Sequence, residues 1–182
     1  MKWVNYLFVA GLMSLQFVAI GTSDGKPGSP RAGSSVHKGK SATQIIKGFM
    51  NPKTDTVKLT MALQPSEHDL RAVFKSPADA KKAAAYYRKM YGTIRGRGIG
   101  PKPGQTEVVI FKATSKDLQM QRGASKHFPG GYKRIAAKLR KGLTLYRWKY
   151  LERGKKYGMS FDGLLKVKGK WIFIPKPFRA LR

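Results

Sequence analysis

The sequence predicts an α+β fold in which short N-terminal helices pack on a curved antiparallel sheet that ends in a three-stranded meander. Helix-start signals are concentrated between residues 54 and 92. One apolar run follows at 106–114, and three runs rich in aromatic and β-branched residues lie between 143 and 175. Because strands follow helices instead of alternating with them, an antiparallel sheet is favoured over a parallel one.

The meander is the clearest structural signal in the chain. Residues 152–156 and the pair Lys168-Gly169 close its two hairpins, since glycine supplies the positive φ of a tight turn. A two-residue loop at Lys168-Gly169 places Val167 opposite Lys170, and strict alternation then defines two faces. One face carries Met159, Phe161, Leu165, Val167, Ile172 and Ile174, and the other carries Asp162, Leu164, Lys166, Trp171 and Phe173. Both faces are partly apolar, which predicts helices on one face and a pocket or a partner on the other.

The helices are predicted from their N-terminal signals. Thr54 or Asp55 begins a helix over 56–63, and Ser66 begins another, with Asp69 at capping-box spacing. Ser76-Pro77 is the strongest start signal, because an N-cap residue precedes proline at the first helical position. That helix ends at Gly92 and buries a tyrosine-rich band.

Three further elements are predicted. Ile45, Ile46 and their neighbours in 42–53 form one or two helical turns. The run 106–114 is a strand, and its unbroken apolar centre predicts a central position, buried on both faces and interrupted at Ser115. Residues 132–141 form a short basic helix.

The N-terminal region is predicted to be a leader and a linker. Residues 1–21 resemble a cleaved signal peptide, with an uncleaved membrane anchor as the alternative. Residues 22–41 are rich in Gly, Ser, Pro and Lys, and predict a disordered linker in which His37 is solvated. Residues 42–182 then form a single α+β domain.

Charge is the outlying property of the chain. It has 37 Lys+Arg against 9 Asp+Glu, a formal net charge of +28. This sign predicts an anionic partner: nucleic acid, lipid head groups or polysaccharide. General basicity without a specific role is the alternative. There is no Cys, so disulfides and thiolate sites are excluded.

The predicted anion-binding residues lie on the basic helix and the strand after it. They are Lys133, Arg134, Lys138, Arg140, Lys141, Arg147 and Lys149. Tyr146, Trp148 and Tyr150 alternate with the last of these charges, so base stacking is conceivable. Burial of the three rings on one face of the strand is the preferred interpretation.

Catalytic residues are weakly indicated. Asp162, Tyr146 and His127 are the candidates, because a buried carboxylate beside a Tyr or His can serve proton transfer. The sequence contains no nucleophile triad or paired carboxylates, and it predicts no cofactor and no metal site.

The element order, with Lys170-Trp171 entering the last strand, resembles the cystatin-like α+β cone of nuclear transport factor 2-like and ketosteroid-isomerase-like domains over about Asp55 to Leu181. That resemblance implies a pocket with a carboxylate, Tyr or His, as in a small isomerase or lyase. The stretches 101–106, 128–133, 158–164 and 175–179 are similar to those of small bacterial secreted proteins of unknown function, which implies no activity.

The sequence therefore predicts a secreted or periplasmic, non-enzymatic protein whose basic surface binds an anionic partner. A cone-fold isomerase or lyase and a pocket carrier of a small acidic ligand are the alternatives.

Overall fold

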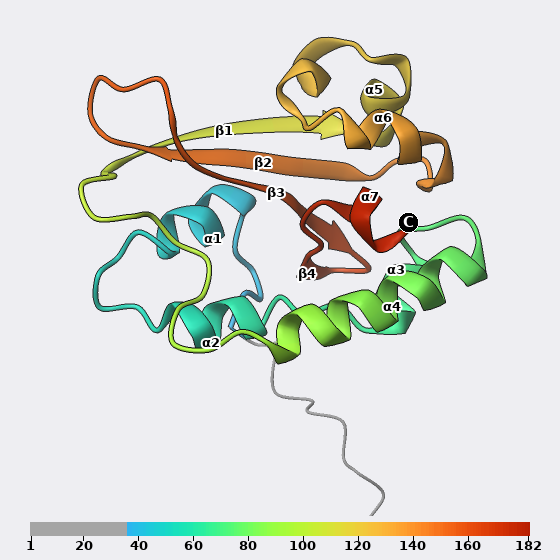
Figure 1. Cartoon of the computed structure of the whole chain (residues 1–182), viewed down its shortest axis with the longest axis horizontal. Coiled ribbons are helices and arrows are strands. Elements are labelled where there is room, and N and C mark those ends of the chain that lie inside the picture. The colour runs from blue at the N-terminus through green and yellow to red at the C-terminus, as the bar shows by residue number, and fades with distance from the viewer. Residues whose placement is uncertain (1–35) are drawn as a thin grey trace, which may run out of the picture.

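The computed structural model describes residues 36–182 and confirms an α+β fold (Figure 1). The predicted leader at 1–21 and linker residues 22–35 lie outside the described residues. The strands are β1 Glu107–Thr114, β2 Thr144–Leu151, β3 Gly158–Val167 and β4 Lys170–Phe173. The α-helices are α1 Ala42–Gly48, α2 Thr56–Met61, α3 Glu67–Arg71, α4 Pro77–Gly92, α5 Ser115–Met120, α6 Gly131–Ile135 and α7 Pro177–Ala180. Two 3₁₀ segments are η1 Gly123–His127 and η2 Ala136–Lys138.

The predicted helix starts are confirmed by their hydrogen bonds. Asp55 caps α2, and Ser66 forms a capping box with Asp69 at the start of α3. Ser76 caps α4 directly before Pro77, as proposed from the sequence. These caps satisfy backbone N–H groups that have no partner within a helix.

The meander is confirmed, and β1 extends it to four antiparallel strands in the order β1-β2-β3-β4. Val167 pairs with Lys170 across a two-residue loop. Both loop residues have positive φ, +47° at Lys168 and +80° at Gly169, which is the pattern of a type I′ hairpin turn.

A β-bulge at Gly163 interrupts the alternation of side chains in β3. Leu164 pairs with Tyr146 and Asp162 with Arg147, so Gly163 has no partner on β2. Its φ is +95°, and a Cβ atom there would lie 2.2 Å from the carbonyl oxygen of Ile174. Only glycine fits this position without a shift of the backbone.

The bulge makes the predicted division of the two faces wrong at the start of β3. Phe161 lies on the same face as Phe173, and its ring centroid is 5.5 Å from that of Trp148. Asp162 accordingly turns to the face of Leu165. One extra residue in a strand moves every preceding side chain to the opposite face.

The inner face of the sheet packs on α1 and α4. Trp148 and Tyr150 are fully buried there, and the Tyr150 hydroxyl donates to the carbonyl oxygen of Ile46 at 2.8 Å. From α4, the buried Tyr91 hydroxyl donates to the carbonyl oxygen of Phe173 at 2.8 Å. The tyrosine band of α4 is therefore part of the core, as predicted.

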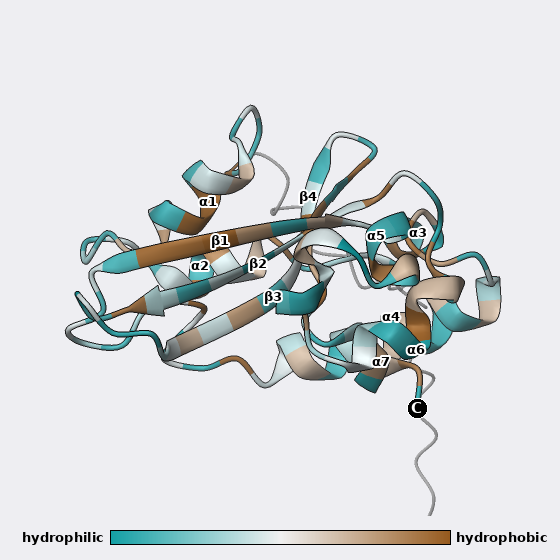
Figure 2. Ribbon diagram, turned by 90° about the horizontal axis from the view of Figure 1, so that it is seen from above, coloured by the Kyte–Doolittle hydropathy of each residue, from teal (hydrophilic) through white to brown (hydrophobic). Residues whose placement is uncertain are grey.

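The outer face is only partly covered. Figure 2 shows β1, β2 and β3 uncovered over the left half of the view, with α5, α6 and α7 gathered at the right. We call this uncovered surface the open sheet face; its residues are Val109, Phe111, Arg147, Lys149 and Ser160. The predicted central position of the 106–114 strand is wrong, because β1 is an edge strand and Val109 is 40 % exposed. The apolar run of β1 has two causes: alternate side chains pack on the inner face, and Phe111 on the outer face is partly covered by His127.

Two helical segments differ from prediction. Thr114 and Asp117 form a capping box, so α5 begins where a break was expected at Ser115. The basic helix predicted over 132–141 is instead α6 followed by η2, because Leu139 turns into a bridge with Phe74.

We expect the substitution Gly163→Ala to destabilise the protein, because the added methyl group meets the Ile174 carbonyl. Gly142→Ala is the matched control, since φ there is also positive, +79°, but no atom lies within 4 Å of the added Cβ. Chemical denaturation should give a free energy of unfolding about 1–3 kcal/mol lower for Gly163→Ala than for the control. Equal values for the two variants would contradict the steric role of the bulge.

Candidate anion-binding site

The predicted basic helix contributes two of its cations to internal contacts. The Lys138 ammonium lies 3.1 Å from Oδ1 of Asp79. The Nε of Arg140 donates to the carbonyl oxygens of Arg71 at 2.9 Å and Phe74 at 3.2 Å. These two residues fasten the segment after α6 to the α3–α4 region and are less available to a ligand.

The other cations of that segment remain at the surface. Lys133, Arg134 and Lys141 are exposed. The Arg134 guanidinium lies 5.8 Å from the ring centroid of Phe178, a cation–π distance. A pocket of about 280 Å³ beside α6 adds Lys126 to this region.

The structure places Arg147 and Lys149 on the open sheet face. Arg147 stands in one row between its cross-strand neighbours Phe111 and Asp162. Its Nε is buried and has no hydrogen-bond partner within the described residues. The terminal nitrogens of the guanidinium keep access to solvent and make no hydrogen bond within the described residues, which makes them the candidate donors to an anionic group.

The rings that alternate with these cations point to the inner face. Trp148 and Tyr150 are fully buried, and Tyr146 packs edge-on against Trp171 with centroids 5.8 Å apart. The preferred interpretation of the three rings as a buried face is confirmed for Trp148 and Tyr150, whereas Tyr146 is half-buried. Trp148 and Tyr150 are unavailable for base stacking.

The three weak catalytic candidates do not come together. Asp162 lies on the outer face at 4 % exposure, whereas Tyr146 lies on the inner face. His127 stacks on Phe111 of β1, with ring centroids 4.0 Å apart. The grouping of Tyr146 with Asp162 is therefore wrong, because successive residues of a strand alternate between its faces.

Asp162 instead joins three parts of the chain. Its Oδ1 accepts from the Tyr132 hydroxyl at 2.7 Å and from the backbone N–H of Lys176 at 2.9 Å. Burial, together with the adjacent Asp162 carboxylate, raises the pKa of Tyr132 well above its usual value. Tyr132 therefore stays protonated and acts as a hydrogen-bond donor at ordinary pH.

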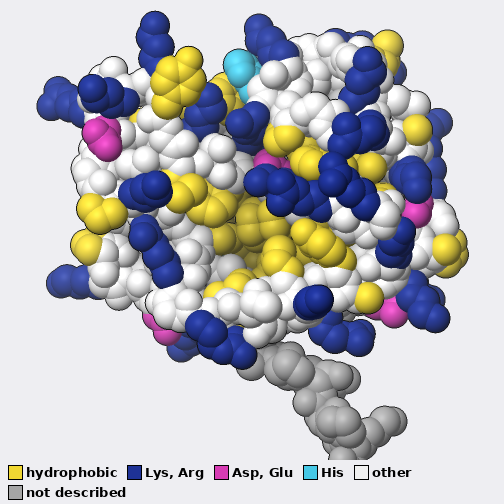
Figure 3. Space-filling view, viewed as in Figure 1, with side chains coloured by type: hydrophobic (Ala, Val, Ile, Leu, Met, Phe, Trp, Pro, Cys, Tyr) yellow, Lys and Arg dark blue, Asp and Glu magenta, His cyan; other side chains and the backbone are white. Residues whose placement is uncertain are grey.

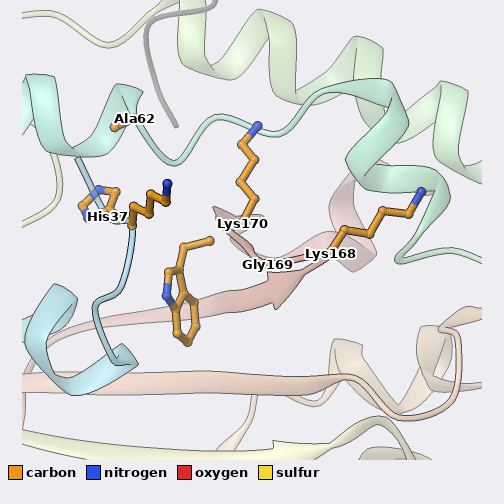
Figure 4. A pocket seen from close by; sticks show the side chains of 7 residues that line it. His37, Ala62, Lys168, Gly169 and Lys170 are labelled. Atoms are coloured by element: carbon orange, nitrogen blue, oxygen red, sulfur yellow. The ribbon is translucent and has the colours of Figure 1, made fainter. Parts of the chain in front are cut away.

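A second group of cations surrounds a pocket that the sequence analysis missed (Figure 4). We call it the lysine pocket. It is lined by His37, Lys38, Ala62, Lys168, Gly169, Lys170 and Trp171, and its volume is about 280 Å³. It brings the chain before α1 and the end of α2 together with the β3–β4 hairpin, which lies more than 100 residues later in the sequence.

His37 is buried in a wall of this pocket. Solvation was predicted for it, but its side chain is 4 % exposed and its Nε2 lies 3.0 Å from the carbonyl oxygen of Leu59. Burial lowers the pKa of His37, against the opposing effect of the Leu59 bond. Its Nδ1 is buried without a hydrogen-bond partner.

Lys170 is held by a carboxylate at the edge of the pocket. Its ammonium lies 2.7 Å from Oδ2 of Asp69, which is 7 % exposed. Burial by itself would raise the pKa of Asp69, but hydrogen bonds from Lys170 and Ser66 outweigh it, and the pKa lies below its usual value. Asp69 is therefore ionised at neutral pH.

The family models, curated proteins and solved structures with which the chain was compared contain no match to it. The cone-like resemblance therefore stays a prediction. Within residues 36–182, no cluster of His, Asp and Glu has a geometry that fits a metal ion.

We expect Tyr132→Phe to lower the free energy of unfolding by about 1–3 kcal/mol, because the buried Asp162 oxygen loses a donor. Tyr157→Phe removes the same hydroxyl from a side chain that is 87 % exposed and should change little. Chemical denaturation at pH 7 measures both. Equal effects of the two substitutions would contradict a structural role for the Tyr132–Asp162 bond.

Asp69→Asn should destabilise the protein at neutral pH by about 1–2 kcal/mol, a value discounted because Lys170 is partly exposed. The pKa of Asp69 is lower in the folded than in the unfolded chain. Its contribution is therefore complete above the unfolded value of about 3.9 and is lost as pH falls through the folded pKa.

When chemical denaturation is repeated across pH 2–7, the free energies of unfolding of the wild-type protein and the Asp69→Asn variant should accordingly converge at the acid end. Glu67→Gln breaks an exposed pair on the same helix and serves as the control. A difference that does not change with pH would show that the Asp69 charge is not the cause.

Proposed function

We propose that this protein is a non-enzymatic binding protein that takes an anionic partner on the open sheet face and the adjacent α6. The observation that carries the proposal is that Arg147 and Lys149 lie on the same face of β2 and make no salt bridge within the described residues. A guanidinium offers paired donors that fit the oxygens of a carboxylate or phosphate group.

The surface charge supports binding to a partner with many such groups. Figure 3 shows Lys and Arg side chains spread over the front of the molecule, with few acidic ones among them. Four of the described carboxylates each lie within 4 Å of a Lys or Arg nitrogen. Over the whole chain, Lys and Arg still exceed Asp and Glu by a formal net charge of +28. Release of counterions then favours association with polysaccharide, anionic lipid or nucleic acid.

Recognition would proceed through charge and not through base stacking. Among the rings that flank Arg147 and Lys149 in the sequence, Trp148 and Tyr150 are buried on the other face, and the half-buried Tyr146 also points there and packs against Trp171. This favours repeated phosphate, sulfate or carboxylate groups as the recognised chemistry over the bases of a nucleic acid.

The proposed location is outside the cytoplasm, either secreted or periplasmic. The basic and apolar pattern of residues 1–21 supports it, with an uncleaved anchor as the alternative. Within residues 36–182, no helix has both the length and the hydrophobicity of a membrane span.

A carrier of a small acidic ligand is the second candidate. Figure 3 shows a hollow in the front surface where hydrophobic side chains gather beneath a group of Lys and Arg side chains. An apolar floor with a cationic rim suits an acid with an apolar body. The isomerase or lyase alternative has less support, because Asp162 is buried and already bonded to Tyr132 and Lys176.

Binding to heparin, double-stranded DNA and anionic vesicles across a salt series tests the proposal. The double variant Lys133→Ala/Lys149→Ala should reduce the slope of log K against log salt by about two, since each lost contact lowers it by about one. Lys47→Ala/Lys53→Ala removes the same charge from the α1 side of the sheet and should leave the slope nearly unchanged.

Arg147→Lys keeps the charge but removes the paired donors. It should weaken binding to the preferred polyanion while leaving the salt slope unchanged. Equal effects of the two double variants would mean that binding follows net charge alone, and would overturn the assignment to the open sheet face. The absence of binding to all three probes near physiological salt would overturn the function itself.

A further inference from the structure

We propose that an extended acidic peptide segment adds to the sheet as a further strand beside the first half of β3, residues 158–162. We call this segment the free edge of β3. Alternate apolar side chains of the added strand fill the hollow on the inner side of the sheet. Because this surface is an edge and not the open sheet face, binding here is independent of the polyanion site proposed above.

The first half of β3 has a neighbouring strand on one side only. β4 pairs with β3 from Leu164 to Val167, and the N–H of Ile174 donates to the carbonyl oxygen of Gly163 at 2.9 Å. Residues 158–162 pair with β2 alone, and within the described residues their backbone makes no hydrogen bond on the other side. Such an edge presents N–H and C=O groups onto which another strand can add.

The chain leaves β3 open because it turns away directly after Ile174. Lys176 carries the next N–H that could reach the backbone of β3, but this N–H donates to the Asp162 side chain at 2.9 Å. Lys176 also has a φ of +47°, which ends the extended backbone, and Pro177 then begins α7. Local residues therefore stop β4 before it can cover the free edge.

The inner side of the free edge borders an apolar hollow. Figure 3, in the view of Figure 1, shows hydrophobic side chains gathered in a hollow between β3 and α4. Met159 and Phe161 face inward, opposite Tyr150 and Trp148 of β2, and both are half-buried. Every second side chain of an added strand projects to this same side, where it contacts Met159 or Phe161.

The charges around the free edge favour an acidic strand. The β2–β3 hairpin before it exposes Arg153, Lys155 and Lys156 against one acid, Glu152, and Lys176 is exposed beyond its other end. These four cations make no salt bridge within the described residues. Complementary charge steers an acidic segment to this edge. The same charges repel a second copy of the chain, whose own net charge is +28.

The other edge strand of the sheet, β1, lacks this preference. Its exposed charged residues are Glu107 and Lys112, one of each sign, so an acidic strand gains little from charge there. Its exposed apolar residue, Val109, lies on the outer face opposite Lys149. Pairing beside β3 is therefore favoured over pairing beside β1.

Fluorescence anisotropy of the full chain with a labelled octapeptide of alternating Glu and Val tests the proposal near physiological salt. A peptide of four Glu followed by four Val should bind about tenfold more weakly, because its Val side chains cannot all face the hollow. Alternating Lys and Val should not bind measurably. Equal affinity of the two acidic peptides would assign binding to charge alone, and it would overturn the proposal, as would no binding of the alternating acidic peptide.

Methylation of the peptide nitrogens tests backbone pairing with the protein unaltered. Only every second N–H of an added strand points to β3, so methylating the Val nitrogens or the Glu nitrogens should have opposite results. One of these two peptides should lose about tenfold in affinity, and the other should lose little. Equal affinities would contradict strand addition. Sedimentation of the chain alone should show a monomer, and a dimer that the peptide dissociates would assign the edge to a second copy instead.

The substitution Met159→Glu tests the position of the strand. It places a negative charge on the inner face of the free edge and should weaken binding of the alternating acidic peptide about tenfold. Met120→Glu is the matched control, because it makes the same change on α5 at a side chain that is 56 % exposed. Thermal unfolding checks that both variants are folded. Equal losses in the two variants, or a loss in Val109→Glu without one in Met159→Glu, would overturn the assignment to β3.

Discussion

The buried carboxylate of Asp162, set in the β3 bulge, is the contact on which the arrangement of the second half of the chain depends. The bulge at Gly163 turns this side chain to the outer face, where Tyr132 and the backbone of Lys176 both donate to it. One acceptor thereby joins β3, α6 and the segment that leads into α7. In a protein with so few carboxylates, this one is used for structure, and it leaves the neighbouring Arg147 without a partner for its Nε.

The same shortage of acids explains why the surface is so strongly basic. Asp69, Asp79 and other carboxylates are engaged in caps and ion pairs that fix helices to the sheet or to each other. Within residues 36–182 the remaining cations make no salt bridge, so external anions lower the free energy of this surface. The open sheet face and the lysine pocket differ in what they offer: a guanidinium beside an aromatic stack in one, and ammonium groups around a buried imidazole in the other.

Elements specified by neighbouring residues were predicted well, and those specified by distant contacts were not. The caps at Ser66 and Ser76 and the loop at Lys168-Gly169 depend on a few consecutive residues, and each was located correctly. The faces of β3 were wrong because a bulge is enforced by the approach of Ile174, which no local pattern reveals. The lysine pocket was missed because its residues, from His37 to Trp171, lie at opposite ends of the domain.

By itself, the sequence determined the α+β class, the helix starts, the meander and the excess of positive charge, since composition, caps and tight turns act over short distances. Tertiary structure alone decided which cations are free. Packing ties Arg140 and Lys138 to α3 and α4, buries the rings of β2, and gathers Lys38 and Lys168 around one pocket. The physical reason is that the availability of a charge depends on burial and on partners, and both are set by residues far away in the chain.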